Sequence, residues 1–101
     1  MHLINTTFCV ERSIDTAFRS WLKNVYIRSA LSTPFLSGPM LTRVLEQEDP
    51  TATTYALHLR ATSLAEARRW HDETAAMLRD DMSARFGQRV LFFTTYLEII
   101  D

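Results

Sequence analysis

The segment VLFFTTYLEII, residues 90–100, carries the most information about the fold of this chain. It is rich in residues that favour β-strands, and it is apolar at both odd and even positions. A strand with one solvated face alternates apolar and polar residues, so this segment predicts a strand with both faces covered. Its odd positions are expected to pack under helices: Leu91, Phe93, Leu97 and Ile99. Its even positions are expected on the opposite face and are the candidates for a dimer interface: Val90, Phe92 and Tyr96.

Length and composition indicate one globular domain spanning residues 1–101. Hydrophobic residues make up 47% of the chain, which is ordinary for a domain that buries a core. The formal net charge of −1 gives no electrostatic footprint for nucleic acid or an anionic membrane surface. No segment looks like a membrane span or a signal peptide. One cysteine, Cys9, excludes an internal disulfide, and this favours the reducing cytoplasm.

Hydrophobic periodicity predicts the order strand, helix, strand, strand, helix, strand. The strands are expected near residues 3–10, 36–45, 53–61 and 90–100. The first helix should begin at Ser13 or Asp15 and end before Pro34. The second should begin at a capping box, Ser63-Leu64-Ala65-Glu66, and end at Gly87. Residues 46–50 read as an acidic solvated loop.

This order of elements is typical of the ferredoxin-like α+β fold, βαββαβ. The fold predicts a four-stranded antiparallel sheet in the order 4-1-3-2 with both helices on one face. The last strand then lies at an edge, and an edge strand that is apolar on both faces needs a cover. A second copy stacked on the open sheet face would supply it, so the sequence predicts a homodimer of the dimeric α+β barrel type.

Several short stretches resemble a family of short bacterial proteins of unknown function. They are Asn5-Thr6-Thr7, Trp21-Leu22, Leu31-Ser32-Thr33, Arg43-Val44-Leu45-Glu46, Tyr55-Ala56-Leu57, Ala76-Met77-Leu78-Arg79, Arg85-Phe86-Gly87 and Leu97-Glu98. The resemblance covers nearly the whole chain and implies a ferredoxin-like fold without an established activity. Members often carry His-Ile-Pro where this chain has Tyr26-Ile27-Arg28. If that histidine transfers protons, Tyr26 replaces it with a poor base at neutral pH.

A small polar patch is the only candidate pocket that the pattern offers. His58 and Arg60 fall on the face of the third strand that points away from the helices. Asn5 and Thr7 of the neighbouring first strand should face them, with Tyr96 on the other flank. Polar groups inside an apolar dimer cavity suit a small organic ligand. The alternative is a set of hydrogen-bonded polar residues inside an interface.

The remaining residues offer less chemistry. His71 lies on the inner stripe of the second helix and is expected to be a core histidine. No spacing of Cys, His or carboxylates indicates a metal site, and no glycine-rich loop indicates a phosphate-binding cofactor. Trp70, Met77 and Ile27 lie beside the main apolar stripes, where they could meet a loop or a partner protein.

Three functions therefore stay open. The first is a non-catalytic homodimeric binding or interaction module. The second is a cofactor-independent enzyme of the monooxygenase or isomerase kind, with His58 as acid or base. The third is a regulatory subunit that recognises another protein through Trp70, Met77 and Ile27. Because the fold hosts many functions, only the geometry of a site can separate them.

Overall fold

Four antiparallel strands form one sheet in the order β2-β3-β1-β4, which confirms the predicted order 4-1-3-2. The strands are β1 (His2–Glu11), β2 (Leu36–Arg43), β3 (Ala52–Ala61) and β4 (Val90–Glu98). The computed structural model describes residues 1–46 and 49–100. The two central strands, β1 and β3, pair along their whole length, and β4 is an edge strand as expected.

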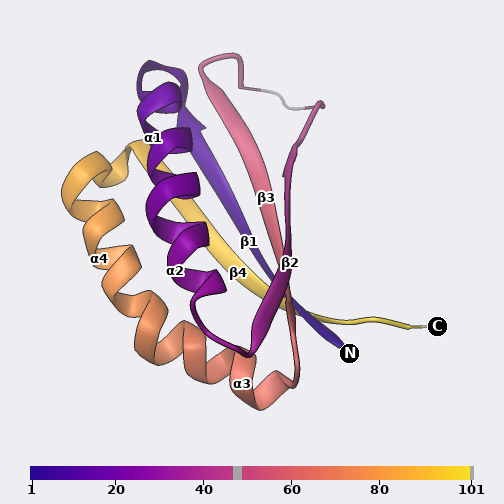
Figure 1. Cartoon of the computed structure of the whole chain (residues 1–101). Helices are drawn as coiled ribbons and strands as arrows, with labels where there is room; N and C mark the ends of the chain where they lie inside the picture. The colour runs from indigo at the N-terminus through magenta and orange to yellow at the C-terminus, as the bar shows by residue number, and fades with distance from the viewer. Residues whose placement is uncertain (47–48, 101) are drawn as a thin grey trace.

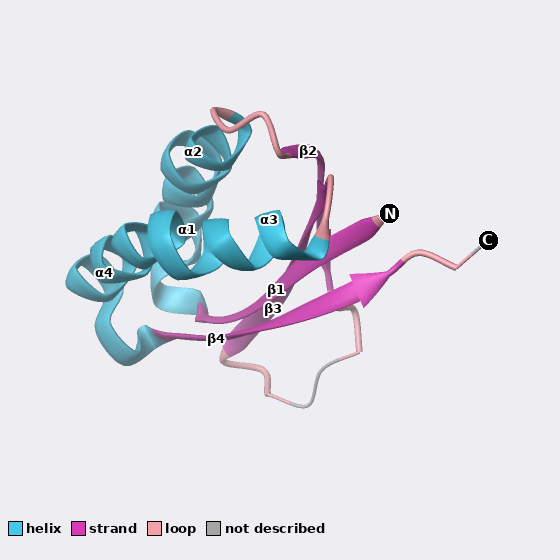
Figure 2. Ribbon diagram, turned by 90° about the horizontal axis from the view of Figure 1, so that it is seen from below, coloured by secondary structure: helices cyan, strands magenta, loops and turns pink. Residues whose placement is uncertain are grey.

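Two long helical segments cover one face of this sheet and leave the other face open (Figures 1 and 2). The first comprises a 3₁₀ turn (Arg12–Ile14), α1 (Asp15–Trp21), a π-helical turn (Leu22–Ile27) and α2 (Arg28–Leu31). The second comprises α3 (Leu64–Arg69), a π-helical turn (Trp70–Thr74) and α4 (Ala75–Phe86), and a 3₁₀ turn (Gly87–Arg89) leads into β4. The ferredoxin-like arrangement is therefore confirmed.

The second helical segment begins and ends where its sequence predicts. The Ser63 hydroxyl accepts a hydrogen bond from the Glu66 N–H at 3.1 Å, which satisfies one of the free donors of the first turn. Gly87 follows Phe86 with a φ of +57°, a conformation that side chains with a Cβ rarely adopt. The capping box is half formed, because Glu66 Oε2 is buried without a hydrogen-bond partner.

The start of β2 is irregular, as the Ser37-Gly38-Pro39 stretch predicts. The register of β2 against β3 shifts between Ser37 and Met40. Gly38 has a φ of +56°, and a Cβ there would lie 3.3 Å from Cδ of Arg60. A bulge of this kind bends the strand and leaves a poor template for edge-to-edge pairing.

Aromatic rings fill the space between the sheet and the helices. Phe18 of α1 is fully buried, and its ring lies 5.3 Å from Phe8 of β1 and 5.7 Å from Phe86 of α4. The helices are also tied to each other by Trp21, whose Nε1 donates to Asp81 Oδ2 at 2.8 Å. Arg85 donates to the same carboxylate at 3.0 Å. The core therefore joins both helical segments to the two central strands.

The two faces of β4 are the reverse of the expected ones. In the register with β1, Val90 pairs with Val10, Phe92 with Phe8 and Tyr96 with Ile4, and paired residues share a face. Val10, Phe8 and Ile4 belong to the core under the helices. The even positions of β4 thus lie on the helix-covered face, and the odd positions lie on the open face: Leu91, Phe93, Thr95 and Leu97. A segment that is apolar on both faces gives no periodic signal that separates them.

Two other expectations are not confirmed. Trp70 is only 4% exposed and Ile27 packs against the core, so they do not form the exposed surface that the regulatory hypothesis requires. The expected acidic loop at residues 46–50 includes residues 47 and 48, which lie outside the described residues. Within the described ranges, no helix has the length and apolarity needed to cross a membrane.

Two leucines provide a matched test of this core. Leu57 in β3 is 1% exposed, whereas Leu45 after β2 is 88% exposed. Leu57→Ala is expected to lower the free energy of unfolding by about 2–5 kcal/mol, because it removes buried contacts and leaves a cavity. Leu45→Ala is expected to change it by less than about 0.5 kcal/mol. Urea unfolding followed by circular dichroism measures both, and equal losses would contradict the assignment of the core.

Candidate functional site

Four of the five predicted pocket residues share the open face of the sheet. Asn5 of β1 lies directly opposite His58 of β3. Thr7 and Arg60 lie two pairs away on either side, opposite Ala56 and Leu3 respectively. Strand alternation places all of these side chains on the face away from the helices. The structure therefore brings Asn5, Thr7, His58 and Arg60 together as one group, the open-face polar group.

Tyr96 does not belong to this group. It lies on the helix-covered face with Ile4, so its prediction as a pocket residue beside His58 is wrong. Its place on the open face is taken by Thr95, whose hydroxyl accepts a hydrogen bond from Asn5 Nδ2 at 3.2 Å. The other amide atom, Asn5 Oδ1, is buried without a partner. An unpaired buried acceptor is costly.

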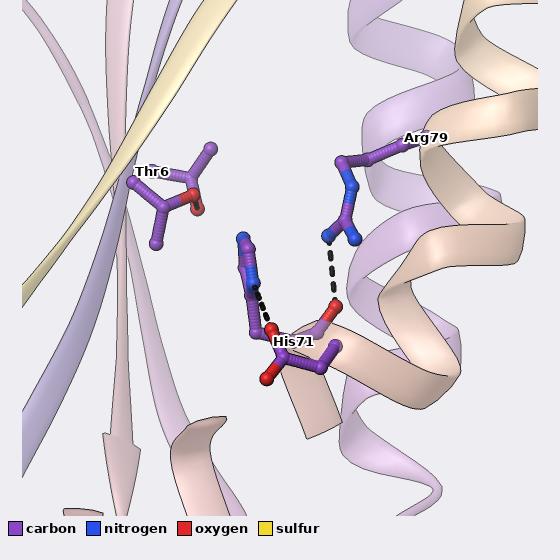
Figure 3. A network of polar contacts seen from close by, with 5 residues as sticks. Thr6, His71 and Arg79 are labelled. Atoms are coloured by element: carbon purple, nitrogen blue, oxygen red, sulfur yellow. Dashed lines mark hydrogen bonds and ion pairs between the residues drawn. The ribbon is translucent and has the colours of Figure 1, made fainter. Parts of the chain in front are cut away.

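A second group of polar side chains lies under the helices. Thr6 of β1 and Thr94 of β4 face each other there, with their hydroxyl oxygens 3.2 Å apart. In Figure 3 the His71 imidazole points from the helix toward Thr6, and Arg79 donates to the His71 carbonyl oxygen at 2.9 Å. Tyr26 and Tyr96 complete this covered polar cluster, since Tyr26 interacts with Thr6 and the Tyr96 ring lies 6.1 Å from that of His71.

The π-helical turns position two of these side chains, His71 and Tyr26. A π turn inserts one residue and rotates everything after it around the helix. In the second helical segment the Ala75 N–H bonds to the Trp70 carbonyl, five residues back. Trp70 and Ala75 consequently share the buried face, and His71 lies beside them above the sheet. In the first segment the turn carries Tyr26 into the core, where its ring meets that of Trp70 at 5.9 Å.

Burial dominates the electrostatics of the covered polar cluster. It raises the pKa of Tyr26 above its ordinary value of 10.0, and the Thr6 hydroxyl and the Arg79 charge offset this only in part. Burial also raises the pKa of Tyr96, with a further increase from Asp72 and opposing effects from Arg68 and Arg79. Both phenols therefore stay protonated at neutral pH and act as hydrogen-bonding groups.

His71 has the geometry of an oriented imidazole. Its Nδ1 lies 3.3 Å from Asp72 Oδ1, and a carboxylate at that distance holds the ring in one orientation. The ring lies between the helix and the sheet, but its side chain is 21% exposed and it is not part of the core cluster, so the expectation of a core histidine is not confirmed. His58, the histidine that the enzyme hypothesis relies on, instead lies on the open face.

Three clefts lie around the helices and the β2 edge, and His58 lines none of them. The first, about 100 Å³, lies between the loop after α2 and one face of α3. The second, about 370 Å³, separates α1 from the end of α4, and the third, about 240 Å³, lies at the β2 edge beside Tyr55. In residues 1–46 and 49–100, no three His, Cys, Asp or Glu side chains gather closely enough to hold a metal ion.

The sequence pattern did not reveal the covered polar cluster. Its members come from four elements, and Tyr26 lies off the apolar stripe of an undistorted helix. The one signal was the histidine that the resemblance implies at the position of Tyr26, because a histidine there would also be a polar ring.

Comparison with known proteins agrees with this fold. The model of a domain of unknown function, DUF4286, matches residues 1–100. The chain belongs to the DUF4286 family. A solved structure of an ethyl tert-butyl ether D (EthD) family protein from Bacillus halodurans is similar, with a TM-score of 0.66 and 12% sequence identity. The similarity covers 99% of this chain and 100% of that one, and at this identity it shows the fold alone. No curated protein matches the chain.

For this DUF4286 protein, the burial of Tyr26 predicts a dependence of stability on alkaline pH. The folded-state pKa of Tyr26 is raised above the unfolded value of 10.0. Stability is therefore fully present below pH 10 and is lost as the pH rises through the folded pKa, because only the unfolded phenol ionises in between. Tyr26→Phe should reduce this loss. Urea unfolding of both proteins between pH 9 and 11 measures this loss in the free energy of unfolding. An equal decrease with pH in both proteins would contradict the assignment of the effect to Tyr26.

Proposed function

We propose that this DUF4286 protein is a non-catalytic binding module that works as a homodimer, with two copies stacked through their open sheet faces. The observation that carries the proposal is the odd-numbered row of β4. Leu91 and Phe93 are 63% and 60% exposed, and Leu97 is 39% exposed. Met40 of β2 adds a fourth exposed apolar side chain to the same face. Contiguous apolar surface of this kind is typical of interfaces.

The size of the open face fits a stable dimer. Four strands of about nine residues cover roughly 600 Å² in projection, from the usual strand spacing and rise. This projected area is of the same order as the ~800 Å² per partner of a standard interface. Arg60 and Glu11 lie near opposite ends of the face. A twofold axis across the strands would place the Arg60 end of one copy over the Glu11 end of the other.

The open-face polar group would then lie inside the dimer. The unpaired Asn5 Oδ1 and the neighbouring His58 and Arg60 offer an acceptor, a ring nitrogen and a cation among apolar side chains. This mixture supports a small organic ligand enclosed between the sheets. Cys9 is a free thiol on the same face, which suits the reducing cytoplasm that we propose as the location.

The proposed dimer predicts how a substitution at Phe93 changes the oligomeric state. Phe93→Asp places a charge in the centre of the apolar row, and burying it would be costly without a partner. The expected result is a monomer of 11.7 kDa, whereas the unmodified protein elutes with twice that mass. Met77, which is exposed on α4, supplies the matched control, and Met77→Asp should remain dimeric. Size exclusion with light scattering at micromolar concentration decides this, and a monomeric unmodified protein would contradict the proposal.

A second candidate function is acid–base chemistry without a cofactor in the covered polar cluster. It is favoured by His71, whose imidazole is oriented by Asp72 and directed at Thr6. A base held by a carboxylate next to a hydroxyl is a recurring catalytic arrangement. In this protein, however, Thr6 already faces Thr94, and this mutual contact favours a structural role.

Native mass spectrometry of the purified protein distinguishes the binding module from the enzyme, when the same His-to-Asn substitution is made at each of the two histidines. We expect a small molecule retained between the sheets to be lost in His58→Asn and kept in His71→Asn. The reverse pattern would assign the ligand to the covered polar cluster and support the enzyme. Retention in both variants would contradict both histidine assignments.

A further inference from the structure

The cleft of about 100 Å³ beside α3 lies in the helical layer of a single protomer, away from the open sheet face. One wall is the loop that follows α2, with Thr33 and Phe35. The other wall is a single face of α3 and the following π turn. Its members are spaced as neighbours on a helix: Glu66, Arg69, Trp70, Glu73 and Thr74.

Two buried polar atoms belong to residues that line this cleft, and neither has a hydrogen-bond partner. Trp70 Nε1 can only donate, and Glu66 Oε2 is a carboxylate oxygen that accepts. Most buried polar groups in proteins are paired, so each unpaired one calls for an explanation. The indole N–H needs an acceptor and the carboxylate oxygen needs a donor.

The charges around the cleft indicate whether the ligand group that donates to Glu66 is charged or neutral. Arg69 and Glu73 form an ion pair of 3.5 Å, and both side chains are mostly exposed at the rim. They largely neutralise each other. Glu66, the other acidic residue of the cleft, forms no ion pair with the described residues. Phe35 and Trp70 add aromatic rings, whose faces attract cations. A cationic donor therefore fits the cleft better than a neutral one.

We propose that this cleft binds a small primary amine that carries a neighbouring hydroxyl group. The ammonium donates to Glu66 beside the aromatic rings, and the hydroxyl oxygen accepts from the Trp70 indole. The volume is about three times the ~30 Å³ share of one water molecule in the liquid, which is room for a few non-hydrogen atoms. A 1,2-amino alcohol is the smallest molecule that provides both groups.

Ethanolamine titration followed by ¹H–¹⁵N NMR tests the proposal on the full chain. The chain has two indole signals, and Trp70→Phe identifies that of Trp70 by its loss. Ethanolamine is expected to shift the Trp70 signal saturably, with a dissociation constant of about 1 mM for four non-hydrogen atoms. Propylamine lacks the hydroxyl and ethylene glycol lacks the charge, so each should bind at least about tenfold more weakly.

Glu66→Gln keeps the shape and removes the charge, and we expect it to weaken ethanolamine binding about 10–100-fold. Asp80→Asn removes an equal charge from an exposed position of α4 outside the cleft and should change binding by less than about twofold. Unfolding midpoints of both variants show whether the helix start has been disturbed. If Glu66→Gln is unstable, Trp70→Phe with aliphatic proton shifts as the readout still tests the indole contact, with an expected loss of about fivefold or more.

Two results would overturn the proposal. One is the absence of a saturable shift at tens of millimolar ethanolamine. The other is equal binding of ethanolamine and ethylene glycol that is insensitive to Glu66→Gln, which would mean a cleft that holds only solvent. Because the cleft lies within one protomer, the same titration on Phe93→Asp should give unchanged binding. Failure of the cleft and failure of the dimer are thus separate outcomes.

Discussion

The packing of Phe18 against rings from four elements is the contact on which the rest of the structure depends. Its ring meets Phe8 of β1, Tyr55 of β3, Trp21 of α1 and Phe86 of α4. Aromatic rings bury large areas and prefer tilted or edge-to-face contacts, so this cluster holds both helical segments on one face of the sheet. In residues 1–46 and 49–100, no further helix covers the other face of the sheet. The exposed apolar row of β4 and the proposed dimer follow from that asymmetry.

The π-helical turns decide which side chains the helices deliver to the core. A regular helix would place its buried residues three or four positions apart, but Trp70 and Ala75 are five apart and both are buried. The same kind of distortion brings Tyr26 over Thr6 in the first helical segment. The resulting polar groups under the helices largely satisfy one another. Among the described residues, the buried polar atoms without a partner are Asn5 Oδ1 on the open face, Trp70 Nε1 and Glu66 Oε2 of the residues lining the α3 cleft, and His2 Nδ1 at the start of β1. The proposals on binding rest on the first three.

Local signals predicted much of the fold. The helix start at Ser63, the positive φ at Gly87 and the bulge after Ser37 each follow from the chemistry of one or two residues. The open-face polar group also followed, since alternation along β1 and β3 and their expected pairing put Asn5 opposite His58. The wrong predictions have two causes. A strand that is apolar on both faces can be placed either way round, and a helix with a π turn departs from 3.6 residues per turn. Tyr96 and Trp70 were misplaced for these two reasons.

By itself, the sequence determined the order of the elements and, through the fold that this order indicates, the sheet topology with both helices on one face. It could do so because strand and helix periodicities and turn residues act over a few positions. Tertiary structure alone decided which face of β4 meets the helices. Both faces of residues 90–98 are apolar, and the register with Val10, Phe8 and Ile4 selects between them. It also decided that the opposite row, Leu91, Phe93 and Leu97, stays exposed. The strand that indicated a missing partner, β4, therefore carries the proposed interface. The interface uses the odd positions of β4, whereas the sequence had suggested the even positions.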